Sequence, residues 1–114
     1  MMQGLREQRN AITDWLDLSS IYGSTEKEAE ELRDPRQRQF LLVSSGREGR
    51  SFLPRCAERA GRSVETCQGC QEDGNRECIF AGDVRANEQP GLTVMHTLWL
   101  REHNRLLESV GIVL

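Results

Sequence analysis

A short polar loop followed at once by a long amphipathic helix occupies residues 80–105, and this stretch limits most strongly what the chain can fold into. The helix is expected to begin at Pro90, because proline suits the first helical position, where its missing N–H would have no partner. Apolar residues then recur at steps of three, four and seven, which predicts one buried face at helical period: Leu92, Met95, Leu98, Trp99, Leu106 and Val110.

The preceding loop, Gly82 to Gln89, concentrates charged and amide side chains at the start of that helix. Arg85 is its candidate reactive residue, because a guanidinium keeps its proton and can stabilise negative charge that grows during a reaction. An ion pair between Arg85 and Asp83 or Glu88 would explain the same residues without chemistry. Glu88 also suits the positive end of a helix dipole. Composition alone leaves both interpretations open.

A second group of oxygen-bearing side chains lies near the N-terminus, at residues 13–19. It overlaps the end of residues 5–18, which have helical character. In an extended stretch alternate residues point the same way, so Thr13, Asp17 and Ser19 can present oxygens together, with the Trp15 carbonyl between them. Calcium takes six to eight oxygen ligands, so these four supply part of a calcium site. The alternative is a polar helix end followed by a turn.

The middle of the chain predicts one short helix and then little regular structure. Ser24 or Thr25 is expected to cap a helix rich in glutamate, which ends before Asp34-Pro35. The apolar run 40–43 fits either a strand or an extended segment packed against the body. Residues 44–77 read as a long polar loop, a length that is uncommon unless the loop is functional or cross-linked.

Four cysteines, Cys56, Cys67, Cys70 and Cys78, fall within this region and allow three disulfide pairings. The Cys67-x-x-Cys70 spacing also occurs in redox pairs and in half of a zinc site. A four-cysteine zinc site usually has two tight pairs, whereas Cys56 and Cys78 stand alone. Disulfides formed in an oxidising compartment are the structural interpretation. A cysteine-rich zinc module over residues 56–78 is a weaker one.

Length and composition indicate one small domain or a piece of a larger one. The chain has 114 residues, of which 37% are hydrophobic, and a mean hydropathy of −0.61, so a large hydrophobic core formed by this chain alone is not expected. Basic and acidic residues are interspersed and the net charge is −3, which argues against a nucleic-acid partner. No stretch predicts a membrane span, and the first residues lack the apolar run of a secretory signal.

Several motifs, in a fixed order, resemble the animal haem peroxidase family. The matching residues are Arg6-Glu7-Gln8-x-Asn10-x-x-Thr13, Asp17-x-Ser19-x-x-Tyr22-Gly23-Ser24, Leu32-Arg33, Leu53-Pro54, Ala81-Gly82-Asp83-x-Arg85-x-Asn87-Glu88, Pro90-x-Leu92-Thr93-x-Met95-His96-Thr97-Leu98 and Leu100-Arg101-Glu102-His103-Asn104-Arg105. The resemblance covers nearly the whole chain, and long motifs in order are far more specific than a lone Gly-Asp-x-Arg.

The resemblance implies a mainly α fold, part of a helical domain with long disulfide-tied loops and little β-structure. It implies haem b as cofactor, with Arg85 acting on hydrogen peroxide and Glu88 able to form an ester with haem. A halide or phenolic molecule would be the electron donor. Calcium would be held in part by Thr13, Trp15, Asp17 and Ser19. Gln89 departs from one branch of the family, which has methionine there.

The resemblance also places the distal histidine before residue 1 and the iron-ligating histidine beyond residue 114. Residues 1–114 are therefore expected to be a partial domain, inactive alone, from a secreted protein whose partner is the rest of the peroxidase domain. Structural roles are expected for His96 and His103, and Cys78 is expected to pair upstream, with Cys67 preferred over Cys70. The alternative function is a truncated, non-catalytic adhesion or interaction protein.

Overall fold

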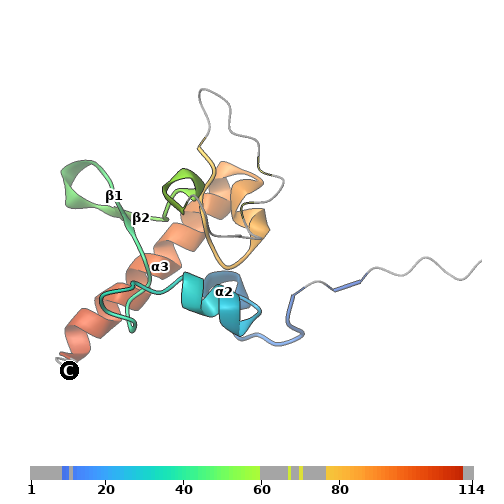
Figure 1. The fold of residues 1–114 in the computed structure, drawn as a ribbon, viewed down its shortest axis with the longest axis horizontal. Helices are drawn as coiled ribbons and strands as arrows, with labels where there is room; N and C mark the ends of the chain where they lie inside the picture. Colours follow the sequence, from blue (N-terminus) through green and yellow to red (C-terminus); the bar gives the residue numbers. More distant parts are fainter. Residues whose placement is uncertain (1–8, 11, 60–66, 68–69, 71–76, 112–114) are drawn as a thin grey trace, which may run out of the picture.

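The longest helix in the part of the chain that the structure describes is α3 (Pro90–Val110), against which segments from the start, middle and end of that part pack, as described below (Figure 1). The computed structural model describes residues 9–10, 12–59, 67, 70 and 77–111. The fold is mainly helical, as expected for a piece of a haem peroxidase domain. The other elements, in order, are α1 (Ser19–Tyr22), α2 (Glu26–Glu31), β1 (Ser44–Ser45), η1 (Arg47–Gly49), β2 (Ser51–Phe52), η2 (Cys56–Arg59) and η4 (Val84–Asn87).

The helix α2 forms where the glutamate-rich segment predicted it, because its first turn is capped on both sides. The Thr25 hydroxyl accepts a hydrogen bond from the Glu28 N–H at 3.2 Å, and the Glu28 carboxylate accepts one from the Thr25 N–H at 3.1 Å. This reciprocal pair satisfies two backbone donors that the helix cannot pair itself. Leu32, which follows the helix, is 5% exposed and enters the core.

Regular β-structure in the described residues is confined to the hairpin β1–β2, in which Ser44 pairs with Phe52 in antiparallel register. Gly46 lets the Phe52 ring lie directly over the turn, because a Cβ there would lie 2.1 Å from that ring and would displace it. The apolar run 40–43 joins no ladder. Leu41 makes a single bridge to Arg33 and is 3% exposed, so the run is an extended segment packed against the body.

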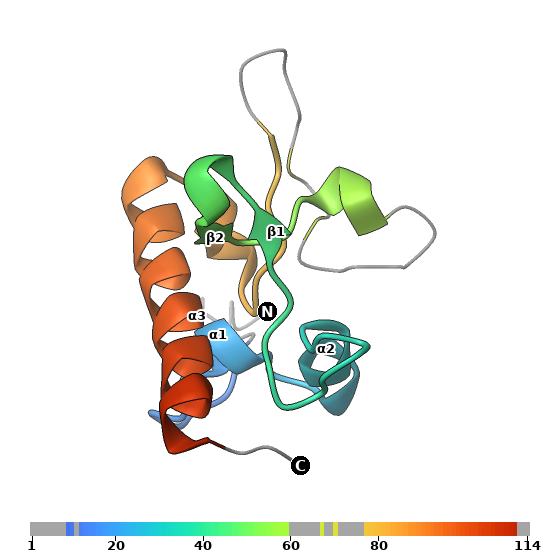
Figure 2. The ribbon, with the colours of Figure 1, turned by 90° about the vertical axis from the view of Figure 1, so that its left-hand side faces the viewer.

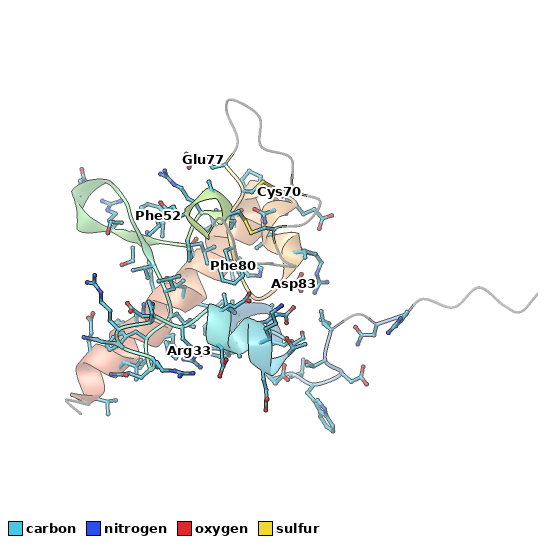
Figure 3. The ribbon with its side chains drawn as sticks, in the orientation of Figure 1. Arg33, Phe52, Cys70, Glu77, Phe80 and Asp83 are labelled. Carbon is cyan, nitrogen blue, oxygen red and sulfur yellow. A yellow bond between two sulfur atoms is a disulfide. The ribbon has the colours of Figure 1, made fainter. Side chains whose placement is uncertain are left out.

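The core lies where α1, the segment before η4 and the inner side of α3 meet (Figure 2). Its centre is Phe80, which is 1% exposed (Figure 3). The buried apolar residues come from every part of the described chain after residue 18: Ile21, Leu32, Leu41, Leu53, Phe80, Ala81, Ala86 and Leu100.

The predicted apolar face of α3 is wrong for this chain. Of its members, only Leu92 is even partly buried. The residues that α3 does bury are His96 and Leu100, at 8% and 4% exposure. The apolar side chains that stand exposed on α3 are Val94, Met95, Leu98, Trp99, Leu106 and Val110. Contacts on the other side of the helix, described below, fix its rotation.

The helical character expected for residues 5–18 is wrong where the structure tests it, from residue 12 onward. Residues 12 and 14–17 form bends, and the first helix begins at Ser19, after Leu18 adopts a left-handed conformation with φ 57°. The Asp17 carboxylate accepts the Ser19 N–H at 3.0 Å. Such local side-chain bonds offer the backbone an alternative to the helix. Residues 5–8 and 11 lie outside the described residues.

The cysteines pair as Cys56–Cys67 and Cys70–Cys78, so the partner preferred for Cys78 was wrong. A bridge between Arg55 and Ile79 sets Cys56 and Cys78 next to each other, and the Cys56 N–H donates to the Cys78 carbonyl at 2.8 Å. From there each reaches a different cysteine of the Cys67-x-x-Cys70 pair. Both bonds use all four thiols, which overturns the zinc module.

Candidate functional site

The loop that carries Arg85 is held by side-chain caps at both ends. Asp83 caps η4, since its Oδ1 accepts the Arg85 N–H at 2.9 Å. Gln89 caps α3 by accepting the Gly91 N–H at 3.0 Å, and Pro90 is the first helical residue, as predicted. The Thr93 hydroxyl donates to the Ala86 carbonyl at 2.6 Å and ties the loop to the helix. The loop is therefore a fixed support for the side chains on it.

Asn87 adds a further anchor that the sequence did not indicate. Its Oδ1 accepts the Ile79 N–H and its Nδ2 donates to the Ile79 carbonyl, both at 2.8 Å. Asn104, on α3, does the same to Leu41, at 2.9 and 3.0 Å. Each amide pairs with one backbone residue as a neighbouring strand would. A single asparagine gives no pattern from which such a contact could be predicted.

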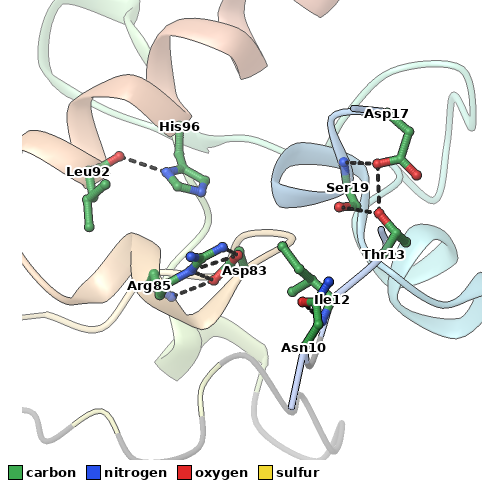
Figure 4. Close-up of polar contacts among 9 residues, drawn as sticks. All are labelled: Asn10, Ile12, Thr13, Asp17, Ser19, Asp83, Arg85, Leu92 and His96. Atoms are coloured by element: carbon green, nitrogen blue, oxygen red, sulfur yellow. Dashed lines mark hydrogen bonds and ion pairs between the residues drawn. The ribbon is translucent and has the colours of Figure 1, made fainter. Parts of the chain in front are cut away.

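Arg85 and Asp83 form a two-point ion pair (Figure 4). Arg85 Nε lies 3.0 and 3.1 Å from the two Asp83 oxygens, and Nη2 lies 2.6 Å from Oδ2. The Asp83 side chain is 3% exposed, whereas that of Arg85 is 57% exposed. The pair thus has a buried anchor and an open guanidinium, whose Nη1 has no hydrogen-bond partner in the described part of the chain.

The same contacts shift the ionisation of both groups. The hydrogen bonds from Arg85 lower the pKa of the Asp83 carboxyl, against the opposing effect of burial. The Asp83 carboxylate in turn raises the pKa of the Arg85 guanidinium. The ion pair with Asp83 that composition allowed is therefore present. It is compatible with a reactive arginine, because it leaves one edge of the guanidinium open.

His96 lies on α3 beside this pair (Figure 4). Its Nδ1 is 2.7 Å from the Leu92 carbonyl and donates a proton to it, so in a neutral ring Nε2 carries the lone pair. Nε2 is buried and finds no partner among the described residues. A positive charge on a protonated His96 ring would lower the pKa of the Asp83 carboxyl, less than the hydrogen bonds from Arg85 do. This proximity was not predicted from the sequence, in which His96 lies thirteen residues after Asp83.

His103 braces α3 against two other segments, in keeping with the structural role expected of it. Its Nδ1 is 2.9 Å from the Tyr22 hydroxyl and its Nε2 is 2.9 Å from the Gln39 carbonyl. Nε2–H donates to that carbonyl, and in the neutral ring the hydroxyl donates to Nδ1. In the residues that the structure describes, no group of three or more His, Cys, Asp or Glu side chains could hold a metal.

The proposed calcium ligands are only partly assembled. Thr13 Oγ1 lies 3.0 Å from Asp17 Oδ1 and 3.0 Å from the Ser19 hydroxyl (Figure 4). Burial raises the pKa of the Asp17 carboxyl, but hydrogen bonds from Thr13 and Ser19 outweigh this and lower it. Three of the four predicted residues therefore meet. The fourth, Trp15, is 79% exposed, and among the described residues no hydrogen bond joins it to these three.

Comparison with known proteins identifies the family of this chain. The profile of the animal haem peroxidase family matches residues 2–111. The chain belongs to this family. It is 47% identical over 106 residues to the human protein named Peroxidasin homolog, and 41% identical over 108 residues to human Thyroid peroxidase. These matches cover 89% and 92% of the chain, but 7% and 12% of the relatives.

A third peroxidase relative, Peroxidasin of Drosophila melanogaster, is 38% identical over 108 residues, which is 92% of this chain and 7% of that protein. The chain thus spans about one eighth or less of the length of these family members. No helix among the described residues is long and apolar enough to cross a membrane.

Proposed function

We propose that this chain is part of a haem-dependent peroxidase domain, which reduces hydrogen peroxide and oxidises a halide or a phenolic donor. The observation that carries the proposal is the Asp83–Arg85 pair, a buried carboxylate that fixes an accessible guanidinium. Membership of the family supports haem as the cofactor beside which this pair would lie. Arg85 and Glu88 fit a haem cofactor, because both side chains are exposed within one turn of the same capped loop.

When bound, haem supplies the iron at which peroxide is reduced. The chain's own contribution is made by Arg85, whose open Nη1 edge can donate a hydrogen bond to a peroxide oxygen as negative charge grows on it. Asp83 holds Nε and Nη2, so the guanidinium need not reorganise during the reaction. Glu88, an exposed carboxylate on the same loop, would be the residue that holds haem.

The test uses a longer peroxidase polypeptide that contains this segment, with Arg85→Ala, Arg85→Lys and the control Arg105→Ala. Arg105 is an exposed arginine on α3 that pairs with Glu102 at 2.7 Å, away from the loop. Arg85→Ala should slow the peroxide step about 100- to 1,000-fold, as loss of one preorganised donor does, while haem absorbance is kept. Arg85→Lys should recover only part of the rate, since lysine lacks the planar fork that Asp83 holds. An unchanged rate in Arg85→Ala removes Arg85 from the mechanism.

For calcium, we propose that Thr13, Asp17, Ser19 and the Trp15 carbonyl supply part of a site that is completed by ligands outside this chain. The hydrogen-bonded triad supports it, because it gathers two hydroxyls and one carboxylate. In the longer polypeptide, calcium should raise the melting temperature, magnesium should not, and Asp17→Asn should abolish the difference. A calcium effect that survives Asp17→Asn would contradict this assignment.

We also propose that residues 1–114 are a partial domain, which is inactive without the rest of the peroxidase polypeptide. The two disulfides support a secreted, extracellular location, since such bonds persist in oxidising compartments. The exposed apolar side of α3 favours one second candidate, a non-catalytic adhesion or interaction protein. Haem binding and peroxide turnover by the natural full-length product would decide between them.

A further inference from the structure

Tyr22 and His103 form a hydrogen-bonded pair that the proposed peroxide chemistry does not use. The Tyr22 hydroxyl lies 2.9 Å from His103 Nδ1, and the two rings meet edge to face with their centres 5.4 Å apart. Tyr22 is the one tyrosine of the chain, and both side chains are half-buried. A phenol gives up an electron most readily when a base accepts its proton at the same time. The pair holds such a phenol and such a base in direct contact.

The contacts on the far side of the imidazole fix the direction of this hydrogen bond. His103 Nε2 lies 2.9 Å from the Gln39 carbonyl, which can only accept, so Nε2 carries the proton. Arg33 Nη1 donates to the same carbonyl at 3.1 Å. In the neutral ring the Nδ1 lone pair therefore faces the Tyr22 hydroxyl, which donates to it. The proton acceptor is in place before any electron is lost.

A fixed positive charge stands beside the pair. The Arg33 guanidinium carbon lies 5.7 Å from the centre of the Tyr22 ring, and Nη1 lies 3.4 Å from His103 Nε2. Loss of an electron adds one positive charge to the pair, so the charge of Arg33 opposes oxidation and raises the reduction potential of Tyr22. A tyrosine held in this way stays reduced until a strong oxidant is present.

The pair lies a short distance from the loop that carries Arg85. His96 lies beside the ion pair of that loop (Figure 4), and His103 follows seven residues later on α3, about 10 Å along the axis. The two backbones also touch, since a Cβ on Gly82 would lie 2.6 Å from the Gly23 nitrogen. Electron transfer through protein weakens steeply with distance, and a separation of this order allows it in a single step.

We propose that Tyr22 and His103 form a proton-coupled redox site, at which Tyr22 loses one electron to a one-electron oxidant. In the same step the phenolic O–H bond breaks and an Nδ1–H bond forms. The products are a neutral phenoxyl radical and an imidazolium that still donates from Nε2 to the Gln39 carbonyl. A phenolic donor then returns the electron and releases its own proton to water, while the proton on Nδ1 goes back to the Tyr22 oxygen. That the oxidant is haem after its reaction with peroxide rests on the proposed function.

Photochemical oxidation of the haem-free chain tests the pair. The oxidant is tris(bipyridyl)ruthenium(III), generated by a light flash, and electron paramagnetic resonance identifies the radical. A neutral tyrosyl radical is expected, formed more slowly in heavy water than in ordinary water and lost in Tyr22→Phe. Oxidation confined to the exposed Trp15 and Trp99, or equal rates in the two solvents, would overturn the proposal.

His103→Gln separates proton transfer from hydrogen bonding that is merely structural. Glutamine offers a donor and an acceptor but no base, so the tyrosyl radical should form about 100-fold more slowly, the contribution of a positioned proton acceptor. Glu108→Gln, an exposed change on the same helix, is the matched control and should react like the natural chain. Circular dichroism verifies that each variant keeps its helices. An unchanged rate in folded His103→Gln would overturn the proposal.

Arg33→Gln supplies a test that leaves both members of the pair in place. Removal of the charge should shift the reduction potential of Tyr22 to a lower value, and Arg33→Lys, which keeps a positive charge, should restore most of the difference. Voltammetry of the purified chain measures the potential. A potential that does not fall in Arg33→Gln would overturn the proposed site.

The longer peroxidase polypeptide distinguishes this site from the proposed function. On addition of peroxide, it should give a tyrosyl signal that is weaker in Tyr22→Phe and unchanged in Glu108→Gln. Peroxide reduction without a signal that depends on Tyr22 would overturn the redox role and keep the proposed function. A polypeptide that does not reduce peroxide would remove the proposed function, and the photochemical result would still decide the pair.

Discussion

The two sides of α3 reverse the usual chemistry of an amphipathic helix. The inner side is attached largely through polar groups, with His103 and Asn104 bonded to neighbouring backbone and only Leu100 entering the apolar core. The outer side carries the larger apolar residues and leaves them exposed. Apolar periodicity therefore does not by itself identify the surface that this chain buries.

The two sides of α3 should differ most in how far the free energy of unfolding falls when a leucine is replaced by alanine. Leu100→Ala should lower the free energy of unfolding by about 2–5 kcal/mol, because it removes a buried side chain and leaves a cavity. Leu98→Ala, two residues along the same helix but 54% exposed, should change it by less than about 0.5 kcal/mol. Urea unfolding followed by far-ultraviolet circular dichroism measures both. Equal losses would mean that the helix is rotated from the position described.

The polar attachment of the inner side can be tested at Asn104. Asn104→Ala should cost about 1–3 kcal/mol, since it leaves the N–H and carbonyl of buried Leu41 without partners. Asn104→Asp should also destabilise, because it keeps an acceptor for the N–H but sets a carboxylate against the carbonyl. Ser109→Ala, which removes an exposed hydroxyl that bonds within the helix, is the control. A neutral result for Asn104→Ala would assign the attachment to apolar packing alone.

The ion pair between Asp83 and Arg85 predicts that the stability of the chain depends on pH. Because the pKa of Asp83 is lowered in the folded chain, the carboxylate stabilises the fold above its unfolded pKa of about 3.9. That stability is lost as the pH falls through the lowered, folded pKa. Asp83→Asn should cost about 1 kcal/mol at neutral pH, a modest value because Arg85 is exposed. The loss of stability between pH 5 and pH 2 should be smaller in the variant than in the natural chain, and equal slopes in chemical denaturation would refute the assignment.

The smallest expected effect in the isolated chain belongs to the exposed apolar side chains of α3, such as Leu98 and Leu106. Replacing Leu98 and Leu106 together by glutamine should change stability by less than about 0.5 kcal/mol per site, because both side chains are already in water. The same double variant should bind much less of an apolar dye such as anilinonaphthalene sulfonate. A large loss of stability would show that these two side chains are covered within the chain itself.

Local signals in the sequence predicted local structure well. The cap at Thr25, the helix start at Pro90 and the contact between Arg85 and Asp83 all depend on residues within a few positions of one another. The rotation of α3 depends instead on Asn104 and His103 reaching segments more than sixty residues away, at Leu41 and Gln39. A pattern of apolar residues carries no information about such distant polar contacts.

The same limit explains the error in the N-terminal region. The spacing of apolar residues favoured a helix before Ser19, but the Asp17 carboxylate and Thr13 hydroxyl bond locally and hold the chain in bends. The candidate calcium residues could be picked from the sequence because they are close in it. The expected contribution of Trp15 depends on a backbone carbonyl, whose position no side-chain pattern reports.

The bridge between Arg55 and Ile79 has a consequence for how this family can vary. Two further bonds flank this bridge: the Cys56 N–H donates to the Cys78 carbonyl at 2.8 Å, and the Phe80 N–H donates to the Pro54 carbonyl at 2.7 Å. The segments on either side of the loop between Arg55 and Ile79 therefore lie next to each other. A tolerated insertion between those two points would keep the backbone bonds that position Leu53 and Phe80, provided that it spares the four paired cysteines. Doubling such an excursion costs only about 0.6 kcal/mol in closure entropy. The loop closed by the Arg55–Ile79 bridge is thus a place where the protein can be lengthened in evolution, or a tag inserted by an experimenter, without disturbing the core.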